Sequence, residues 1–285
     1  MSFEQKTFKK YGSTYYWGSK FFPKPLRDDA YKLYSFVQLV DDYTDSDQTD
    51  AKAFAYIERR WKLIKKQLLK GTVPAKLDDS VNEYALANIA YIVHRYQCDE
   101  AWVDAFLHSK RWDLEGHEYT SFKETLLYMY GSSEVVGLII ARILNFPEEA
   151  LTAARMQARA MQMIDFLRTI QYNTMRGRSY FPTNEIKMHG LKQLSFTEAQ
   201  AKPNMFTDFV QSQLLRYADW QTQANKGYYY VPKKLRPSIQ ATIDTYNATA
   251  KQIKDDPMVV FKKQLKPKKR RIILRAVKYS VKKPT

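Results

Sequence analysis

The sequence predicts an all-α fold in a single domain, and three observations support this. Glycine (9 residues) and proline (11 residues) are too scarce for the frequent tight turns of an all-β protein. Hydrophobic residues make up 45% of the 285 positions, which is enough to bury a sizeable core. Apolar residues recur at helical spacing in several long stretches, and no repeat or Gly/Ser-rich linker divides the chain. We therefore expect one helical domain over residues 1–285.

Three helices are expected in the first half of the chain. The first begins near Leu26, directly after two prolines that set its start, and the second covers Ser80 to Tyr96. The third runs from about Phe122 to Leu144 and contains Gly131 and Gly137. Because a glycine inside a helix costs about 1 kcal/mol relative to alanine, we expect close packing at both glycines.

The second half of the chain is expected to begin with its longest helix. The segment from Leu151 to Asn173 keeps an uninterrupted helical pattern without glycine or proline, and its many apolar residues indicate burial on more than one side. Gly177 and the proline that follows it break the pattern. Two further helices are expected at about Phe206 to Asn225 and Pro237 to Lys254.

The charge and the cysteine content limit the binding partners and the cellular compartment that we expect for the protein. The net charge of +16 attracts polyanions, namely nucleic acid, an anionic membrane surface or phosphorylated small molecules, without choosing among them. The single cysteine, Cys98, excludes an internal disulfide and fits a reducing cytoplasm. The N-terminus lacks the apolar run of a signal peptide, and no stretch approaches the roughly 18 uninterrupted apolar residues of a spanning helix. We expect a cytoplasmic protein, either soluble or peripheral on a membrane.

The C-terminal tail, about residues 262–285, is strongly basic. After Asp256 the chain contains no acid, and its Lys and Arg residues surround apolar residues such as Ile272 and Val277. This pattern is typical of an amphipathic segment that lies on an anionic bilayer. A final helix with a solvated basic face is the open alternative.

Five aspartates lie close together in VDDYTDSDQTD, residues 40–50. Asp41 and Asp45 are four residues apart, hence on one face of a helix, where two like charges repel. A divalent cation removes this repulsion, and Mg²⁺ prefers carboxylate oxygens and is commonly shared with substrate phosphates. The spacing therefore fits half of a metal–diphosphate site, with a solvated acidic helix end as the alternative.

A second polar stripe runs along the longest expected helix. Gln162, Asp165, Thr169 and Asn173 recur at three- and four-residue spacing and share one face. Such groups are costly to bury without partners, so the stripe either lines a cavity or faces water. Facing the acidic pair across a bundle, it would complete a metal–diphosphate site. Three nearby arginines are suited to phosphate oxygens, namely Arg168, Arg176 and Arg178.

Other motifs with a chemical signature are missing from the sequence. The histidines show no metal-ligand spacing, and we find no P-loop, no Rossmann glycine fingerprint and no Gly-x-Ser-x-Gly elbow. The acidic pair and the polar stripe are therefore the candidates for chemistry.

Three segments, in order along residues 14–278, resemble the squalene/phytoene synthase family. TYYWGSKFFPKPLRDDAYKLYSFVQLVDDYTD is similar to the family's opening, which ends in the first Asp-x-x-x-Asp motif. RWDLEGHEYTSFKETLLYMYGSSEVVGLIIARIL has Asp113, Tyr130, Gly131 and Gly137 in matching places. MQMIDFLRTIQYNTMRGRSYFP resembles the second metal motif and the Gly-Arg-x-Tyr-x-Pro that follows it.

This resemblance implies an isoprenoid-synthase-like helical bundle around a central cavity. It also implies a prenyltransferase that joins two allylic prenyl diphosphates head to head through a cyclopropyl diphosphate intermediate, with the farnesyl and geranylgeranyl substrates both open. The implied cofactor is Mg²⁺, which stabilises the leaving diphosphate. NADPH is implied only for a squalene-type product. Nucleic acid is not expected as a partner, and the sequence does not indicate an oligomeric state.

The resemblance also implies roles for individual residues. The implied catalytic residues are Asp41, Asp45, Tyr130, Arg168 and Tyr34. The implied substrate-binding residues are Thr14, Tyr15, Gln38, Gln162, Arg178 and Tyr246. The implied metal ligands are Asp41, Asp45, Asp165, Thr169 and Asn173.

The second metal motif departs from the family pattern. Where the family usually has Asn-x-x-x-Asp-x-x-x-Asp, this chain has Asp165, Thr169 and Asn173, and Gln38 replaces a usual arginine. Metal affinity falls when the ligands carry less negative charge. Two functions therefore stay open: an active transferase with an asymmetric metal site, or a non-catalytic relative that binds or assembles at a membrane. A nucleic-acid-binding helical protein is supported only by the net charge.

Overall fold

The computed structural model describes residues 19, 22–45, 49–262, 265 and 279. Within these residues every regular element is helical, which confirms the all-α prediction. Most of the expected basic tail lies outside the described residues, as do the predicted substrate-binding residues Thr14 and Tyr15. In chain order the elements are α3 (Lys24–Thr44), α4 (Ala51–Leu68), α5 (Val81–Arg95), α6 (Glu100–Glu115), α7 (Phe122–Met129), the π turn η1 (Tyr130–Glu134), α8 (Val135–Ile143), η2 (Glu148–Ala150), α9 (Leu151–Arg168), α10 (Ile170–Met175), α11 (Thr183–Met188), α12 (Phe196–Ala201), α13 (Pro203–Asn225), η3 (Lys226–Tyr230), α14 (Arg236–Asp255) and α15 (Val259–Lys262).

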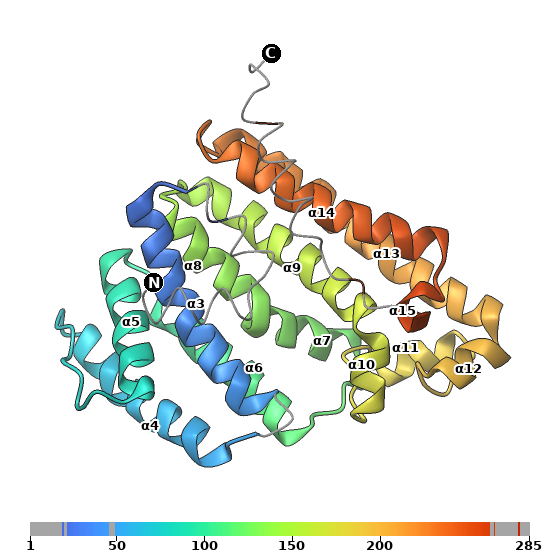
Figure 1. Cartoon of the computed structure of the whole chain (residues 1–285), viewed down its shortest axis with the longest axis horizontal. Coiled ribbons are helices and arrows are strands. Elements are labelled where there is room, and N and C mark those ends of the chain that lie inside the picture. Colours follow the sequence, from blue (N-terminus) through green and yellow to red (C-terminus); the bar gives the residue numbers. More distant parts are fainter. Residues whose placement is uncertain (1–18, 20–21, 46–48, 263–264, 266–278, 280–285) are drawn as a thin grey trace.

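Helix α9 lies at the centre of the bundle. It packs against α8 on one side and against α13 and α14 on the other. Helix α3 packs against α8 and is itself in contact with α4, α5 and α6. Figure 1 shows that α3 and α9 run in the same direction. The C-terminal ends of these two helices, which carry most of the predicted site residues, therefore lie toward the same end of the bundle.

Local sequence signals explain where several helices begin. Helix α3 starts directly after Pro23, with Pro25 in its first turn. Ser80 caps α5 by accepting a hydrogen bond from the Glu83 backbone N–H at 3.3 Å. Asp50 caps α4 in the same way, accepting a backbone N–H at 2.9 Å. One of the five clustered aspartates therefore has a structural role.

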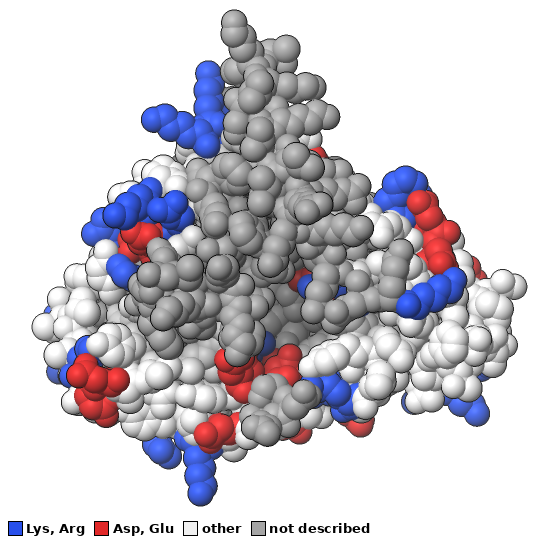
Figure 2. Space-filling model, in the orientation of Figure 1, with Lys and Arg blue, Asp and Glu red and all other residues white. Residues whose placement is uncertain are grey.

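Charged side chains of both signs are interspersed on the face that Figure 2 shows. Nucleic-acid-binding proteins typically gather Lys and Arg into a continuous basic patch or strip. The described residues of this face form no such strip, although the whole chain carries a net charge of +16.

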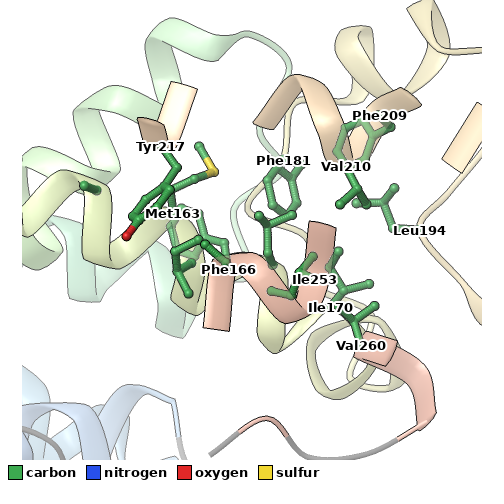
Figure 3. Packing of buried hydrophobic residues seen from close by; sticks show 14 of the residues in the cluster. Met163, Phe166, Ile170, Phe181, Leu194, Phe209, Val210, Tyr217, Ile253 and Val260 are labelled. Carbon is green, nitrogen blue, oxygen red and sulfur yellow. The ribbon is translucent and has the colours of Figure 1, made fainter. Parts of the chain in front are cut away.

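Two clusters of buried apolar side chains stabilise the bundle. One cluster is formed by the helices α3, α4, α5, α6 and α8, and it includes Phe36, Trp61 and Leu86. The other joins α9 with α13 and α14, and Figure 3 shows Phe166 and Phe209 among its members. Burying a large apolar side chain contributes about 1.5–3 kcal/mol to stability. Helices α3 and α9 are each anchored in one of these clusters, which fixes the backbone beneath the predicted site.

The predicted helix over residues 122–144 forms, but a π turn at residues 130–134 interrupts its regular geometry. Among the described residues, Phe122–Ile143 is the one stretch long and apolar enough to cross a membrane. Half of it is buried inside the protein, between α6 and α9. That burial is typical of a core helix.

The close packing predicted at the two glycines of this helix is confirmed. A Cβ atom added to Gly131 would lie 2.3 Å from the Ala105 carbonyl oxygen of α6. A Cβ atom added to Gly137 would lie 2.8 Å from the Ala158 Cβ of α9. The two glycines therefore let α6 and α9 approach the same helix from different sides.

The predicted uninterrupted helix from Leu151 to Asn173 is wrong at one position. The helix is broken at Thr169, whose φ of −110° and ψ of 9° depart from helical values, so α9 ends at Arg168 and α10 begins at Ile170. The Thr169 hydroxyl donates to the Asp165 carbonyl oxygen at 2.6 Å. Threonine hydroxyls that bond backward in this way bend helices. The residues before and after the break therefore do not share one straight face.

Candidate active site

A cavity of about 290 Å³ that is open on one side is lined mainly by α3, α8, α9 and α14. Most of its wall is apolar and includes Ile140 and Ile243. Three predicted site residues also line it, namely Tyr34 of α3 and both Gln162 and Asp165 of α9. A mostly apolar cavity with a few polar groups is the usual form of a small-molecule site.

Asp165 is held by two side chains at the C-terminal end of α9. Arg168 Nε donates to Asp165 Oδ1 at 2.6 Å, and the Tyr246 hydroxyl donates to Oδ2 at 3.2 Å. Tyr246 is almost fully buried on α14. The structure thus brings together three of the predicted site residues, with the carboxylate fixed between an arginine and a tyrosine.

Thr169 and Asn173, the other two predicted ligands on this side, are hydrogen-bonded to each other. Asn173 Nδ2 donates to Thr169 Oγ1 at 3.0 Å, and the Thr169 hydroxyl in turn donates to a backbone carbonyl. Asn173 is buried, with 8% of its surface exposed. The α9–α10 side therefore offers one carboxylate and an internally bonded hydroxyl–amide pair.

Asp41 and Asp45 lie at the C-terminal end of α3, and neither is among the residues that line the cavity. Asp41 follows the cavity-lining residues Tyr34 and Val37 on the same helix face, one turn beyond Val37. Their side chains are partly exposed, at 34% for Asp41 and 37% for Asp45. The acidic pair thus continues the cavity-facing side of α3 past the cavity wall.

Each of these aspartates is paired with a basic side chain. Asp41 Oδ1 lies 2.9 Å from Lys110 Nζ, and this buried oxygen has no further hydrogen-bond partner among the described residues. Asp45 forms an ion pair with Arg178. Arg176 Nη2 also donates to the Asp45 backbone carbonyl at 3.2 Å. Two of the three predicted phosphate-binding arginines therefore reach the acidic pair from the segment after α10.

Lys110 and Asp113 of α6 form a buried cluster that sequence reasoning did not assign to the site. Lys110 Nζ lies 2.9 Å from Asp113 Oδ2, and the hydroxyls of Tyr128 and Tyr180 donate to Asp113 at 2.9 to 3.0 Å. A lysine and an aspartate three residues apart among the apolar residues of α6 was the available signal.

Burial controls the protonation of this cluster. Burial raises the pKa of Asp41, and the nearby Lys110 ammonium offsets only part of the rise. Burial, reinforced by the charge of Asp113, likewise raises the pKa of Asp45. For Lys110, burial opposes the charge, but the Asp113 and Asp41 carboxylates outweigh it and raise its pKa well above the usual value. Burial also raises the pKa of Tyr128 well above its usual value, so this hydroxyl stays protonated and donates.

The remaining predicted residues lie outside these contacts. Gln38 donates to Asp42 Oδ1 at 2.9 Å, along α3. Tyr130 lies in the π turn, where its ring packs against the α3–α6 core and the Arg155 guanidinium lies 5.3 Å from the ring centroid. Tyr130 is not among the residues that line the cavity.

The oxygens fit a divalent cation on one side of the site. Asp41 and Asp45 present two carboxylates one turn apart, although Lys110 already lies 2.9 Å from Asp41 Oδ1. On the other side Asp165 is the single carboxylate among the predicted ligands. Thr169 and Asn173 offer a hydroxyl and an amide, which are hydrogen-bonded to each other. In the part of the chain that the structure describes, no three His, Cys, Asp or Glu side chains are grouped to hold a metal. A cation here would need further oxygens from water or from a ligand.

Comparisons with known proteins agree with this arrangement. The family model described as squalene/phytoene synthase matches residues 8–271. The 15-cis-phytoene synthase of Synechococcus elongatus is 23% identical over 272 residues, covering 90% of this chain and 84% of that protein. The presqualene diphosphate synthase of Rhodopseudomonas palustris is 25% identical over 185 residues, covering 63% of this chain and 62% of that protein.

Solved structures share the fold. A squalene synthase from Alicyclobacillus acidocaldarius superposes with a TM-score of 0.73 at 16% identity, covering 88% of this chain and 92% of that one. A dehydrosqualene synthase solved with a ligand gives a TM-score of 0.73 at 18% identity, covering 98% and 94%. Since the family model spans most of the sequence, this chain belongs to the squalene/phytoene synthase family.

Proposed function

We propose that this protein joins two allylic prenyl diphosphates head to head and releases diphosphate. The observation that carries the proposal is the mostly apolar cavity, in whose lining Gln162 and Asp165 lie toward the C-terminal end of α9, beside Arg168. An apolar wall suits a prenyl chain, and a guanidinium suits phosphate oxygens. The relatives named phytoene synthase and presqualene diphosphate synthase support the same reaction class.

The side chains divide the chemistry between the wall and the mouth of the cavity. The apolar wall excludes water from the allylic cation, which water would otherwise capture. Tyr34 lines the cavity and offers a π-face to that cation. Arg168, Arg176 and Arg178 donate charge-assisted hydrogen bonds to the diphosphate oxygens. Asp41 and Asp45, with Asp165 opposite, would hold Mg²⁺, which when bound stabilises charge on the leaving diphosphate.

The reaction is balanced in two steps. In the first, a carbon–carbon bond forms between two substrates, one diphosphate leaves, and a proton is lost as the cyclopropyl diphosphate closes. In the second, the remaining diphosphate leaves, and the resulting cation either loses a proton or accepts a hydride from NADPH. Loss of a proton gives a phytoene-type product, and transfer of a hydride gives a squalene-type product.

Turnover with defined substrates tests the proposal. The protein is incubated with farnesyl or geranylgeranyl diphosphate, with and without Mg²⁺ and NADPH, and released diphosphate and hydrocarbon are measured. We expect Mg²⁺-dependent release of two diphosphates for each hydrocarbon molecule. Absence of release with both substrates, from folded protein, contradicts the proposal.

A second candidate function is that of a non-catalytic relative that binds or assembles at a membrane. One observation favours it: Asp41, Asp45 and Asp165 are each ion-paired with a basic side chain, and the Thr169–Asn173 pair is bonded internally. In that case an Asp41→Ala variant should match the parent in every assay with substrate. Measurable turnover that this substitution abolishes excludes the second candidate.

A further inference from the structure

Lys110 is a buried cation placed directly against the acidic pair. Its side chain is 9% exposed, and its Nζ lies 2.9 Å from Asp41 Oδ1 and 2.9 Å from Asp113 Oδ2. A buried ammonium is costly unless it is paired, so the two carboxylates fix its position. Asp113 is itself held by the hydroxyls of Tyr128 and Tyr180. The lysine is therefore built into α6 at a set distance from Asp41.

The ionised side chains of the described site are already balanced without a metal. Its acids are Asp41, Asp45, Asp113 and Asp165. Its bases are Lys110, Arg168, Arg176 and Arg178. A carboxylate-rich site depends on metal ions to lower the repulsion between its acids and an incoming diphosphate. In this chain the fixed ammonium of Lys110 already lowers this repulsion at Asp41.

We propose that Lys110 takes the place of one divalent cation at the Asp41/Asp45 side of the site, so that diphosphate binds with one metal ion fewer than these carboxylates alone would hold. The proposal rests on the proposed function in one respect, because both require diphosphate to bind at this site. Lys110 occupies Asp41 Oδ1 and leaves the second Asp41 oxygen and Asp45 for a cation. Lys110 is thus a positioning residue for Asp41 and a permanent positive charge beside the diphosphate.

Counting bound Mn²⁺ in a Lys110→Met variant tests the proposal without turnover. Methionine keeps an unbranched side chain of similar length and removes the charge. With inorganic pyrophosphate present, we expect the variant to bind one more Mn²⁺ per chain than the parent, as measured by electron paramagnetic resonance. Without pyrophosphate, its affinity for Mn²⁺ should rise roughly tenfold, because Asp41 is released.

A matched control removes an ion pair elsewhere. Lys65 forms an ion pair with Asp104 between α4 and α6, away from the cavity lining. A Lys65→Met variant carries the same change in charge and should keep the parent's Mn²⁺ count and affinity. An equal rise in this control would show a general charge effect and overturn the proposal.

A double variant keeps the test decisive if Lys110→Met does not fold. Lys110→Met combined with Asp113→Asn removes one positive and one negative charge, so the buried cluster stays balanced. It should also bind one more Mn²⁺ than the parent. A folded variant of either kind with the parent's Mn²⁺ count and affinity shows that Lys110 is merely structural.

The result separates this inference from the proposed function. A parent protein that binds Mn²⁺ and pyrophosphate with the expected dependence on Lys110, but does not turn over prenyl diphosphates, refutes the proposed function alone. A parent that turns over prenyl diphosphates while Lys110→Met leaves the metal count unchanged refutes the role of Lys110 alone.

Discussion

Arg178 forms an ion pair with Asp45, although the two residues are 133 positions apart in the sequence. Arg178 lies in the segment after α10, and its backbone N–H donates to the Asn173 carbonyl oxygen at 2.9 Å. Asp45 lies at the C-terminal end of α3. The pair therefore connects the two halves of the candidate site, one at the end of α3 and the other in the segment after α10.

Replacing Arg178 should weaken substrate binding more than it weakens the fold. Arg178→Ala removes a charged hydrogen bond to Asp45 and a phosphate-binding guanidinium, so we expect a higher KM for the prenyl diphosphate and a loss of about 1–3 kcal/mol of stability. Arg178→Lys keeps the charge but lacks the planar guanidinium, so its KM should lie between those of the parent and of Arg178→Ala. The control is Arg111→Ala, which breaks the ion pair with Glu58 and should leave KM unchanged.

Asp41 should be essential for turnover, whereas its neighbour Asp42 should not. We expect Asp41→Ala to lower kcat by about a hundredfold or more, the usual effect of removing one group that stabilises developing charge. Asp42 accepts a hydrogen bond from Gln38 and has no contact with Lys110 or Arg178 in the described residues, so Asp42→Ala is the matched control. Equal activity in the two variants would contradict the assignment.

Metal binding should fail at a higher pH than for an exposed aspartate. A metal binds the carboxylate form, so affinity is lost as the pH falls through the pKa, and burial raises the pKa of Asp41 and Asp45. We expect the midpoint of Mn²⁺ binding to lie above the usual aspartate value of about 3.9. The contribution to stability has the opposite sign: these carboxyls stabilise the fold at acid pH, and this is lost as the pH rises from about 3.9 through the raised value. If the pH midpoint of Mn²⁺ binding lies at the ordinary aspartate value, burial does not determine the protonation of Asp41 and Asp45.

Restoring an acid on the α10 side should exchange stability for metal affinity. Asn173→Asp loses the hydrogen bond that the amide donates to Thr169 and buries a charge, so without metal we expect a loss of about 1–3 kcal/mol. With Mn²⁺ and pyrophosphate, Tm should rise more in the variant than in the parent, because ligand charge increases. Asn247→Asp is an exposed control, since its side-chain oxygen can still accept from the Tyr217 hydroxyl. An equal rise in Tm in this control would point to general electrostatics.

The contact between the π turn and α6 leaves no space for a methyl group. Gly131→Ala would place a Cβ 2.3 Å from the Ala105 carbonyl oxygen and 2.8 Å from the Ser109 Cβ. Overpacking of this kind costs about 1–3 kcal/mol, which thermal or urea unfolding would detect. Ser132→Ala, at the next position, removes a buried hydroxyl with no hydrogen-bond partner among the described residues, so its effect should be small.

The helices that the sequence predicted form because their signals are local, but α4 (Ala51–Leu68) and α6 (Glu100–Glu115) were not predicted. Pro23 and Ser80 set the helix starts, and apolar spacing marked the buried faces. The break at Thr169 was not predicted, because whether a threonine hydroxyl bonds backward depends on the packing around it.

The site was predicted in part, for a physical reason. Asp41, Asp45 and Asp165 stood out by their spacing and by the family resemblance. Lys110 and Asp113 resemble any ion pair on a helix surface until α3 and α7 cover them. Burial by elements distant in sequence turns that ordinary pair into part of the site, and the local spacing alone does not show this burial.

The π turn at residues 130–134 also bears on the length of its helix. Such a turn holds one residue more than a regular α-helical turn, so it takes up an added residue without breaking the helix. Deleting one residue there would leave a regular α-helical turn, and α8 would keep Gly137 against Ala158. Within this helix, the π turn is therefore the place where losing a single residue should disturb the packing of α8 least.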